Sequence, residues 1–157
     1  MRKGTLLAIL VALILALAAS VAVAETINGT PRGETLRGTN SADTINGRGG
    51  ADDIRGRGGA DTLQGGPGND MVYGMDGSDK SVAGGVGQDD LYGGLGNDTL
   101  RAAGDGDSDN VYCDAGNDDT AIVEIGDALD DQQIVSETLL PVGTTCENIV
   151  VKGLPIL

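Results

Sequence analysis

The sequence has no histidine, phenylalanine or tryptophan, and its only aromatic residues are Tyr73, Tyr92 and Tyr112. Without histidine the chain has no Ser-His-Asp or Cys-His catalytic group and no histidine-ligated metal site. Aromatic side chains supply much of the buried area of an ordinary globular core. A conventional layered domain is therefore not expected, and most classes of hydrolase are excluded.

Basic residues are also scarce, with 10 Lys and Arg against 24 Asp and Glu and a formal net charge of −14 at pH 7. A strongly acidic chain is repelled by nucleic acid and by anionic membranes, so neither is expected as a partner. The acidity serves either solubility or the binding of a cation. The regular placement of the carboxylates favours a cation.

Long hydrophobic runs are confined to the N-terminus, where Arg2 and Lys3 precede an aliphatic run that ends in Ala-Val-Ala before Glu25. This pattern predicts a signal peptide, residues 1–24, and hence a secreted, extracellular protein without a membrane anchor after cleavage. Cleavage would remove both basic residues and no acid, which takes the net charge from −14 to −16. The alternative is an uncleaved anchor, because the stretch is about long enough to span a bilayer.

Glycine, by contrast, is abundant, with 27 residues that follow a period of nine. Residues Gly47–Tyr73 read GRGGADDIR, GRGGADTLQ and GGPGNDMVY, with glycine in the first and fourth places, aspartate in the sixth and an aliphatic residue in the eighth. A strict tandem period predicts a repeat solenoid. Each unit divides into a glycine-rich turn and a short strand, so two units form one coil and stacked coils pair as parallel strands.

Some units depart from this pattern. Near the start, Glu34 replaces the aspartate of one unit and Ser41 replaces the fourth-place glycine of the next. Further along, Ala83 is read as an extra residue, and Ser81 interrupts the aliphatic column, so Val82 is expected to point inward through a small bulge. A later unit is stretched by two residues.

The units GGPGNDMVY, GGVGQDDLY and GGLGNDTLR resemble the G-G-x-G-x-D-x-U-x nonapeptide of hemolysin-type (RTX) calcium-binding proteins. The resemblance covers about Gly29–Ala121. It implies an all-β, right-handed parallel β-roll over residues 25–121, in which each aspartate and nearby turn carbonyls share Ca²⁺ with the turn one coil later. In the larger hemolysins and proteases with these repeats, a separate domain supplies the activity, and no such domain is apparent here.

The expected Ca²⁺ ligands are the sixth-place aspartates. Units two apart face the same edge of the roll, which places Asp43, Asp61 and Asp79 at one edge and Asp52 and Asp70 at the other. Turn formation is the alternative role for any one aspartate, but it does not require a carboxylate in every unit. The full set is Asp43, Asp52, Asp61, Asp70, Asp79, Asp89, Asp98, Asp109 and Asp118, with Gly47, Gly56, Gly65, Gly84 and Gly93 expected to lend carbonyls or to serve only as turn formers.

Several Ca²⁺ ions are expected to drive folding of the repeats. Carboxylates stacked at the strand spacing, about 5 Å, repel one another. A divalent cation with oxygen ligands removes this repulsion and bridges neighbouring coils, so its binding free energy becomes folding free energy.

The period dissolves after Ala121, and residues 122–157 are expected to cap the stack, whose open strand edges would otherwise invite association. Cys113 and Cys146 are the only cysteines; they form a disulfide, remain free thiols or bridge two molecules, and an oxidising compartment favours the disulfide. The runs Val111–Thr120 and Cys146–Ile149 resemble the C-terminal cap of small secreted calcium-repeat proteins, in which the two cysteines pair. The resemblance thus implies a disulfide-tied cap.

We therefore expect a secreted calcium-binding module that is not an enzyme. A two-carboxylate glycosidase does not need histidine, but nearly every repeat acid has a place in the calcium pattern and no aromatic platform for sugar is apparent. The alternative is a calcium-rigidified adhesin with a cell-surface or polysaccharide partner of unknown identity. Five arginines near the front form either a basic stripe or, as is usual for scattered surface charges, pairs with surplus carboxylates: Arg32, Arg37, Arg48, Arg55 and Arg57.

Overall fold

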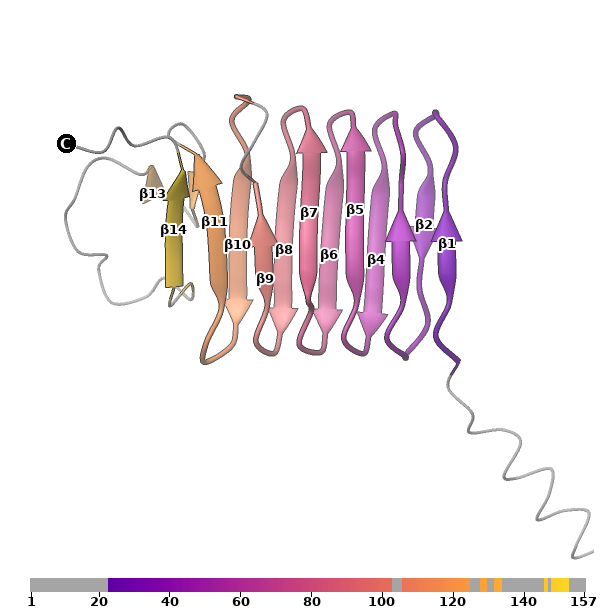
Figure 1. Ribbon diagram of the computed structural model, residues 1–157, viewed down its shortest axis with the longest axis horizontal. Helices are drawn as coiled ribbons and strands as arrows, with labels where there is room; N and C mark the ends of the chain where they lie inside the picture. Colours follow the sequence, from indigo (N-terminus) through magenta and orange to yellow (C-terminus); the bar gives the residue numbers. More distant parts are fainter. Residues whose placement is uncertain are drawn as a thin grey trace, which may run out of the picture.

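The computed structural model describes residues 23–102, 106–124, 128–129, 132–133, 146 and 148–152. Over these residues the chain is a parallel β-solenoid of about 5 turns, with two sheets lying face to face (Figure 1). The predicted all-β parallel roll is confirmed. Nearly all of the expected signal peptide and most of the expected cap lie outside the described residues. In the described part, no helix is long and apolar enough to cross a membrane.

Each sheet takes every second strand, because each nine-residue unit carries the chain from one sheet to the other (Figure 1). The first sheet consists of β1 (Thr26–Asn28), β3 (Thr44–Asn46), β5 (Thr62–Pro67), β7 (Ser81–Val86), β9 (Thr99–Arg101), β11 (Thr120–Glu124) and β14 (Asn148–Lys152). The second consists of β2 (Thr35–Arg37), β4 (Asp53–Gly58), β6 (Met71–Asp76), β8 (Asp90–Leu95), β10 (Asn110–Ala115), β12 (Ala128–Leu129) and β13 (Gln132–Gln133). Neighbouring strands are parallel except for β12 and β13.

The hydrophobic core takes one aliphatic side chain from each unit, in register between coils. Ile45, for example, pairs with Leu63 and Leu63 with Val82. The interior is narrow enough for these side chains alone to fill it, which explains why the chain needs no phenylalanine or tryptophan. From Ile45 onward, the aliphatic eighth-place residues are at most 1% exposed: Ile45, Ile54, Leu63, Val72, Leu91, Leu100 and Val111. Val82 is buried as well, pointing inward as predicted.

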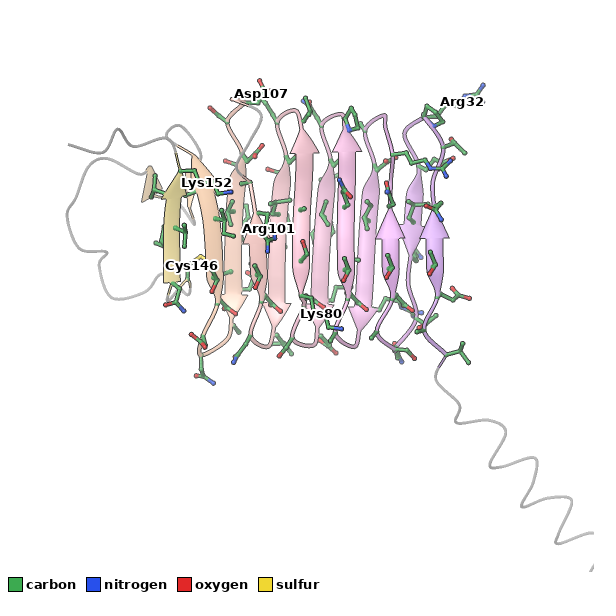
Figure 2. The ribbon with its side chains drawn as sticks, in the orientation of Figure 1. Arg32, Lys80, Arg101, Asp107, Cys146 and Lys152 are labelled. Carbon is green, nitrogen blue, oxygen red and sulfur yellow. A yellow bond between two sulfur atoms is a disulfide. The ribbon has the colours of Figure 1, made fainter. Side chains whose placement is uncertain are left out.

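The extra residue expected at Ala83 lies earlier in its unit. Ser81, Val82 and Ala83 all pair in register with β5. The amide of Lys80 donates to the carbonyl of Asp61 at 2.9 Å, the bond that the residue after the aspartate makes in the other units. The additional residue is therefore Lys80, between Asp79 and Ser81, in the turn where Figure 2 shows it, and the strand itself stays regular.

The C-terminal end of the roll is held by a disulfide. The structure bonds Cys113 to Cys146, 33 residues apart, which confirms the predicted intramolecular pairing (Figure 2). Cys113 occupies the first place of its unit, where most units have glycine, and it is fully buried. Beyond it, β14 pairs with β11 over five residues and covers the edge of the first sheet. β11 spans Thr120–Glu124 and so includes Ala121, after which the cap is expected to begin.

Replacing both cysteines with serine should destabilise the roll without changing its strand content. The disulfide closes a loop between residues 33 apart, and the loss of that constraint costs about 3–4 kcal/mol in the chain-entropy model. Urea unfolding followed by circular dichroism in saturating Ca²⁺ measures the difference. Reductant should lower the stability of the unmodified protein by a similar amount and leave that of the C113S/C146S variant unchanged.

Candidate metal centre

The sixth-place aspartates form two files, one along each edge of the roll. The amide of Asp43 donates to Oδ1 of Asp61 at 2.7 Å, and the amide of Asp52 donates to Oδ1 of Asp70 at 2.8 Å. The same bond recurs along both files, so the neighbours predicted from the period are confirmed as neighbours. One file contains Asp43, Asp61, Asp79, Asp98 and Asp119, and the other Asp52, Asp70, Asp89 and Asp109; all are at most 2% exposed.

The last member of the first file is Asp119, and the prediction of Asp118 for that position is wrong. Oδ1 of Asp119 accepts the amide of Asp98 at 2.8 Å. Asp118 is exposed, and its Oδ1 accepts a hydrogen bond from the side chain of Asn148 at 2.7 Å. The final unit is one residue longer than expected, so Ala121 takes the inward eighth place, and Val123 is the next buried residue of β11.

The second carboxylate oxygen distinguishes these aspartates from ordinary turn residues. In Asp52, Asp61, Asp70, Asp79 and Asp98, the buried Oδ2 has no hydrogen-bond partner among the described residues. Buried polar atoms are nearly always satisfied, so a row of unsatisfied carboxylate oxygens calls for a positively charged partner. Oxygen-only donors fit Ca²⁺ or another hard cation.

The first-place glycines lie directly against these carboxylates. A Cβ built on Gly47 would collide with Oδ2 of Asp52 and lie 2.6 Å from the carbonyl oxygen of Gly65, in the next coil. Gly56, Gly65, Gly84 and Gly93 face the aspartate five residues later in the same way. Within the described residues, no three acidic, histidine or cysteine side chains gather at one point. Any further ligands would therefore be main-chain carbonyls, which the absence of Cβ atoms brings close.

The RTX calcium-binding nonapeptide repeat matches this chain in 4 copies, over residues 28–63, 55–80 and 81–100. Residues 28–100 therefore carry RTX calcium-binding repeats. The matched residues include the buried aspartates from Asp43 to Asp98, and RTX repeats bind calcium and form β-rolls as structural calcium-binding domains. Comparisons with curated proteins and with solved structures gave no match.

Burial and mutual repulsion disfavour charge in the interior of the RTX roll. The pKa values of Asp61, Asp70, Asp79 and Asp98 are raised, chiefly by burial, and that of Asp79 reaches about 6. Neighbouring carboxylates add to the effect, as Asp98 and Asp61 do at Asp79. Amide hydrogen bonds to Oδ1 oppose it without cancelling it. These carboxylates therefore lack a counter-charge.

The N-terminal units supply their own partner for the carboxylate. Oδ2 of Asp43 accepts the amide of Thr39 at 2.5 Å and the Thr39 hydroxyl at 3.0 Å. Glu34 accepts the amide and the hydroxyl of Thr30, each at 2.8 Å. Burial raises the pKa of Asp43, but the hydrogen bonds from Thr39 and Glu25 outweigh it, and the pKa is lowered. Hydrogen bonds from Thr30 likewise lower the pKa of Glu34.

These threonines were not among the predicted site residues, although the sequence contains their signal. Thr30 and Thr39 occupy the second place of the two units that contain Glu34 and Ser41. In the later units up to Leu100, this second place holds arginine, glycine or methionine. A threonine there, four residues before the acid, identifies the units in which the protein itself satisfies the carboxylate.

Substituting Gly47 with alanine should weaken calcium binding, whereas the same change at Gly49 should not. The new Cβ at Gly47 would displace the carboxylate of Asp52, while that at Gly49 meets no atom closer than 3.4 Å. Overpacking a buried site typically costs about 1–3 kcal/mol. Calorimetric Ca²⁺ titration of G47A and G49A measures the difference, and equal affinities in the two variants would show that the first-place glycines are only turn formers.

Acidification should favour the folded state of the calcium-free protein. A carboxyl group whose pKa is higher in the folded than in the unfolded state binds its proton more tightly when folded, so stability rises as the pH falls. For Asp79 this window lies between its folded value of about 6 and the ordinary value of 3.8. The pKa values of Asp43 and Glu34 are lowered in the folded state, so these two groups reduce stability on acidification, but only at a lower pH.

Circular dichroism of the calcium-free protein at pH 7.5 and pH 5 checks this prediction. More strand signal, or a higher urea midpoint, is expected at pH 5. The D79N variant should show a smaller pH dependence, since asparagine does not titrate. A calcium-free roll that loses structure on acidification over this range would contradict the assignment of raised pKa values.

Proposed function

We propose that this chain is a secreted, non-catalytic calcium-binding module whose RTX repeats fold when several Ca²⁺ ions bind between stacked Gly/Asp turns. The observation that carries the proposal is the row of buried carboxylate oxygens that find no partner in the described part of the chain, in Asp52, Asp61, Asp70, Asp79 and Asp98. Leaving each of them unsatisfied would cost about 1–3 kcal/mol or more, because the group is charged. A divalent cation would convert this cost into a bridge between coils.

The residues that would hold Ca²⁺ are the aspartates of the two files and the carbonyls beside the first-place glycines. The ion supplies positive charge, and the chain supplies rigid turns that present oxygen atoms without Cβ atoms in the way. The proposal includes Asp89 and Asp109, which continue the second file. Asp43 is the member of the set with the least need for Ca²⁺, since its Oδ2 already accepts a hydrogen bond from the amide of Thr39.

A non-catalytic role follows from where the acids lie. Their Oδ1 atoms accept amide hydrogen bonds from the neighbouring coil, and their side chains are almost fully buried. A general acid or base must reach a substrate in a cleft, and these carboxylates face the interior of the roll. They are arranged to stabilise a fold.

Secretion is supported by the signal-like N-terminus and by the Cys113–Cys146 disulfide, since structural disulfides persist in oxidising compartments. We further infer that residues 25–121 form the calcium-binding part and residues 122–157 a cap. The pairing of β14 with β11 supports the cap at the edge of the first sheet.

The central test removes calcium and then one carboxylate at a time. The mature protein should lose its strand spectrum in chelator and regain it in millimolar Ca²⁺, the range in which extracellular modules commonly bind, about 10⁻⁴–10⁻³ M. D89N should weaken binding at least about tenfold and lower the calorimetric stoichiometry, because Asp89 is buried within a file.

The neighbouring Asp90 provides a matched control, since D90N removes the same charge one residue later. Asp90 lies on the outside of β8, and its carboxylate accepts a hydrogen bond from the side chain of Asn110 at 2.8 Å. D90N should bind calcium as the unmodified protein does. An unchanged spectrum in chelator, or equal effects of D89N and D90N, would defeat the proposal.

A further inference from the structure

The outer face of the second sheet carries a row of side chains that the calcium pattern does not explain. No aromatic platform is apparent in the sequence, yet the structure stacks Tyr73 on Tyr92 and Tyr92 on Tyr112, with ring centroids 4.6 Å apart in both pairs. The register of β2, β4 and β6 continues the row through Arg55 to Arg37. Two guanidinium groups and three rings thus stand in one line along the roll.

The basic end of this row is a hollow of about 430 Å³, lined by Arg37, Asn40, Arg55, Arg57, Met75 and Asp76. Arg55 forms a salt bridge with Asp53 through two hydrogen bonds of 2.8 and 2.9 Å. Its guanidinium lies 5.6 Å from the ring centroid of Tyr73. Among the described residues, Arg37 and Arg57 make no ion pair. The hollow therefore has two unneutralised guanidinium groups facing one carboxylate, that of Asp76.

The local sequence choices here are unfavourable for folding alone. Arg37 and Arg55 lie directly opposite each other on neighbouring strands, and like charges in this arrangement repel. Arg57 has φ of 85°, in the left-handed region that favours glycine, as do Arg48 and Met75 in their units. It is therefore the repulsion between Arg37 and Arg55 that sets this face apart. Such departures from local consistency concentrate where a residue serves a function.

The other end of the row is largely apolar, with the carboxylate of Asp114 at its rim. A second hollow of about 290 Å³ adjoins the first through Met75 and Asp76 and is lined further by Tyr73, Tyr92, Gly94, Leu95, Asp114 and Ala115. Leu95 is 57% exposed and Met75 43%, so apolar surface is open to solvent next to half-buried rings. The two hollows together form a groove with guanidinium groups at one end and amphipathic rings at the other.

We propose that this groove binds a linear acidic polysaccharide. Guanidinium groups recognise carboxylate or sulfate in two-point hydrogen bonds. Sugar rings present both hydroxyl groups and an apolar C–H face, which suit tyrosines and the apolar surface beside them. The row from Arg37 to Tyr112 spans five strands, that is four spacings of about 4.8 Å, so consecutive sugars of one chain contact the whole row. Inorganic anions or an acidic peptide would use the arginines and leave the rings without a partner.

The side chains of this groove are not among the proposed calcium ligands, which are the file aspartates and main-chain carbonyls, so the two proposals fail independently. Binding of a galacturonic acid oligomer to the folded, calcium-saturated protein is measured by calorimetry, with a galactose oligomer of equal length as the neutral control. The R37Q/R57G variant should lose affinity at least about tenfold per arginine. Glycine at position 57 relieves the left-handed backbone, so loss of fold would not explain loss of binding.

Arg48 supplies the matched control, because it holds the same place in the preceding unit, with φ of 79°, in a turn at the opposite edge of the roll. R48G should bind the acidic oligomer as the unmodified protein does. Several results would overturn the proposal: no binding, equal binding of the neutral oligomer, equal binding of a glutamate oligomer, or equal losses in R48G and R57G. The last of these would mean that general charge or bridging calcium holds the sugar.

Discussion

The structure depends on one carboxylate that serves two neighbouring coils. Oδ1 of each sixth-place aspartate fixes the amide of the corresponding residue one coil earlier, as Asp61 does for Asp43 at 2.7 Å. This bond sets the register of the strands that follow and brings Oδ2 against a first-place glycine. Glycine in the first place, aspartate in the sixth and an aliphatic residue in the eighth are therefore parts of one arrangement, because a change in any of them disturbs the same interior volume.

The same bond creates an electrostatic problem that the chain solves differently along its length. In the interior, burial and neighbouring acids raise the pKa values of Asp61, Asp70, Asp79 and Asp98, which leaves them in need of a cation. At the N-terminal end, threonine hydroxyl and amide groups satisfy Asp43 and Glu34, and their pKa values fall. An end coil has a neighbour on one side only. A partner built into the chain is therefore advantageous at the end, while an ion shared between two coils suits the middle.

Much of this was readable from the period, because one repeat fixes fold, core and carboxylate files together. The errors arose where extra residues enter. The spacing alone does not show which residue of Lys80–Ala83 leaves the ladder, and it does not choose between Asp118 and Asp119, which have the same chemistry. The stacked tyrosines were also missed, although they are 19 and 20 residues apart, as are the aspartates Asp70, Asp89 and Asp109. If the extra residues inferred for the aspartates had also been applied to the outward-facing positions, the three tyrosines would have been predicted to lie in one row.

The outward positions differ from the inward ones because nothing in the fold constrains them strongly. On the first sheet, the corresponding outward row begins with Asn28, Asn46 and Gln64 in register, uncharged amide side chains that suit a solvated strand. On the second sheet, the equivalent surface places arginine opposite arginine and tyrosine on tyrosine. Both faces meet the same requirements for strand pairing and solubility, so these requirements do not account for the contrast. The proposed ligand on the second face would account for it, with the interior, rigid once the proposed Ca²⁺ ions bind, holding the row of side chains at a fixed spacing.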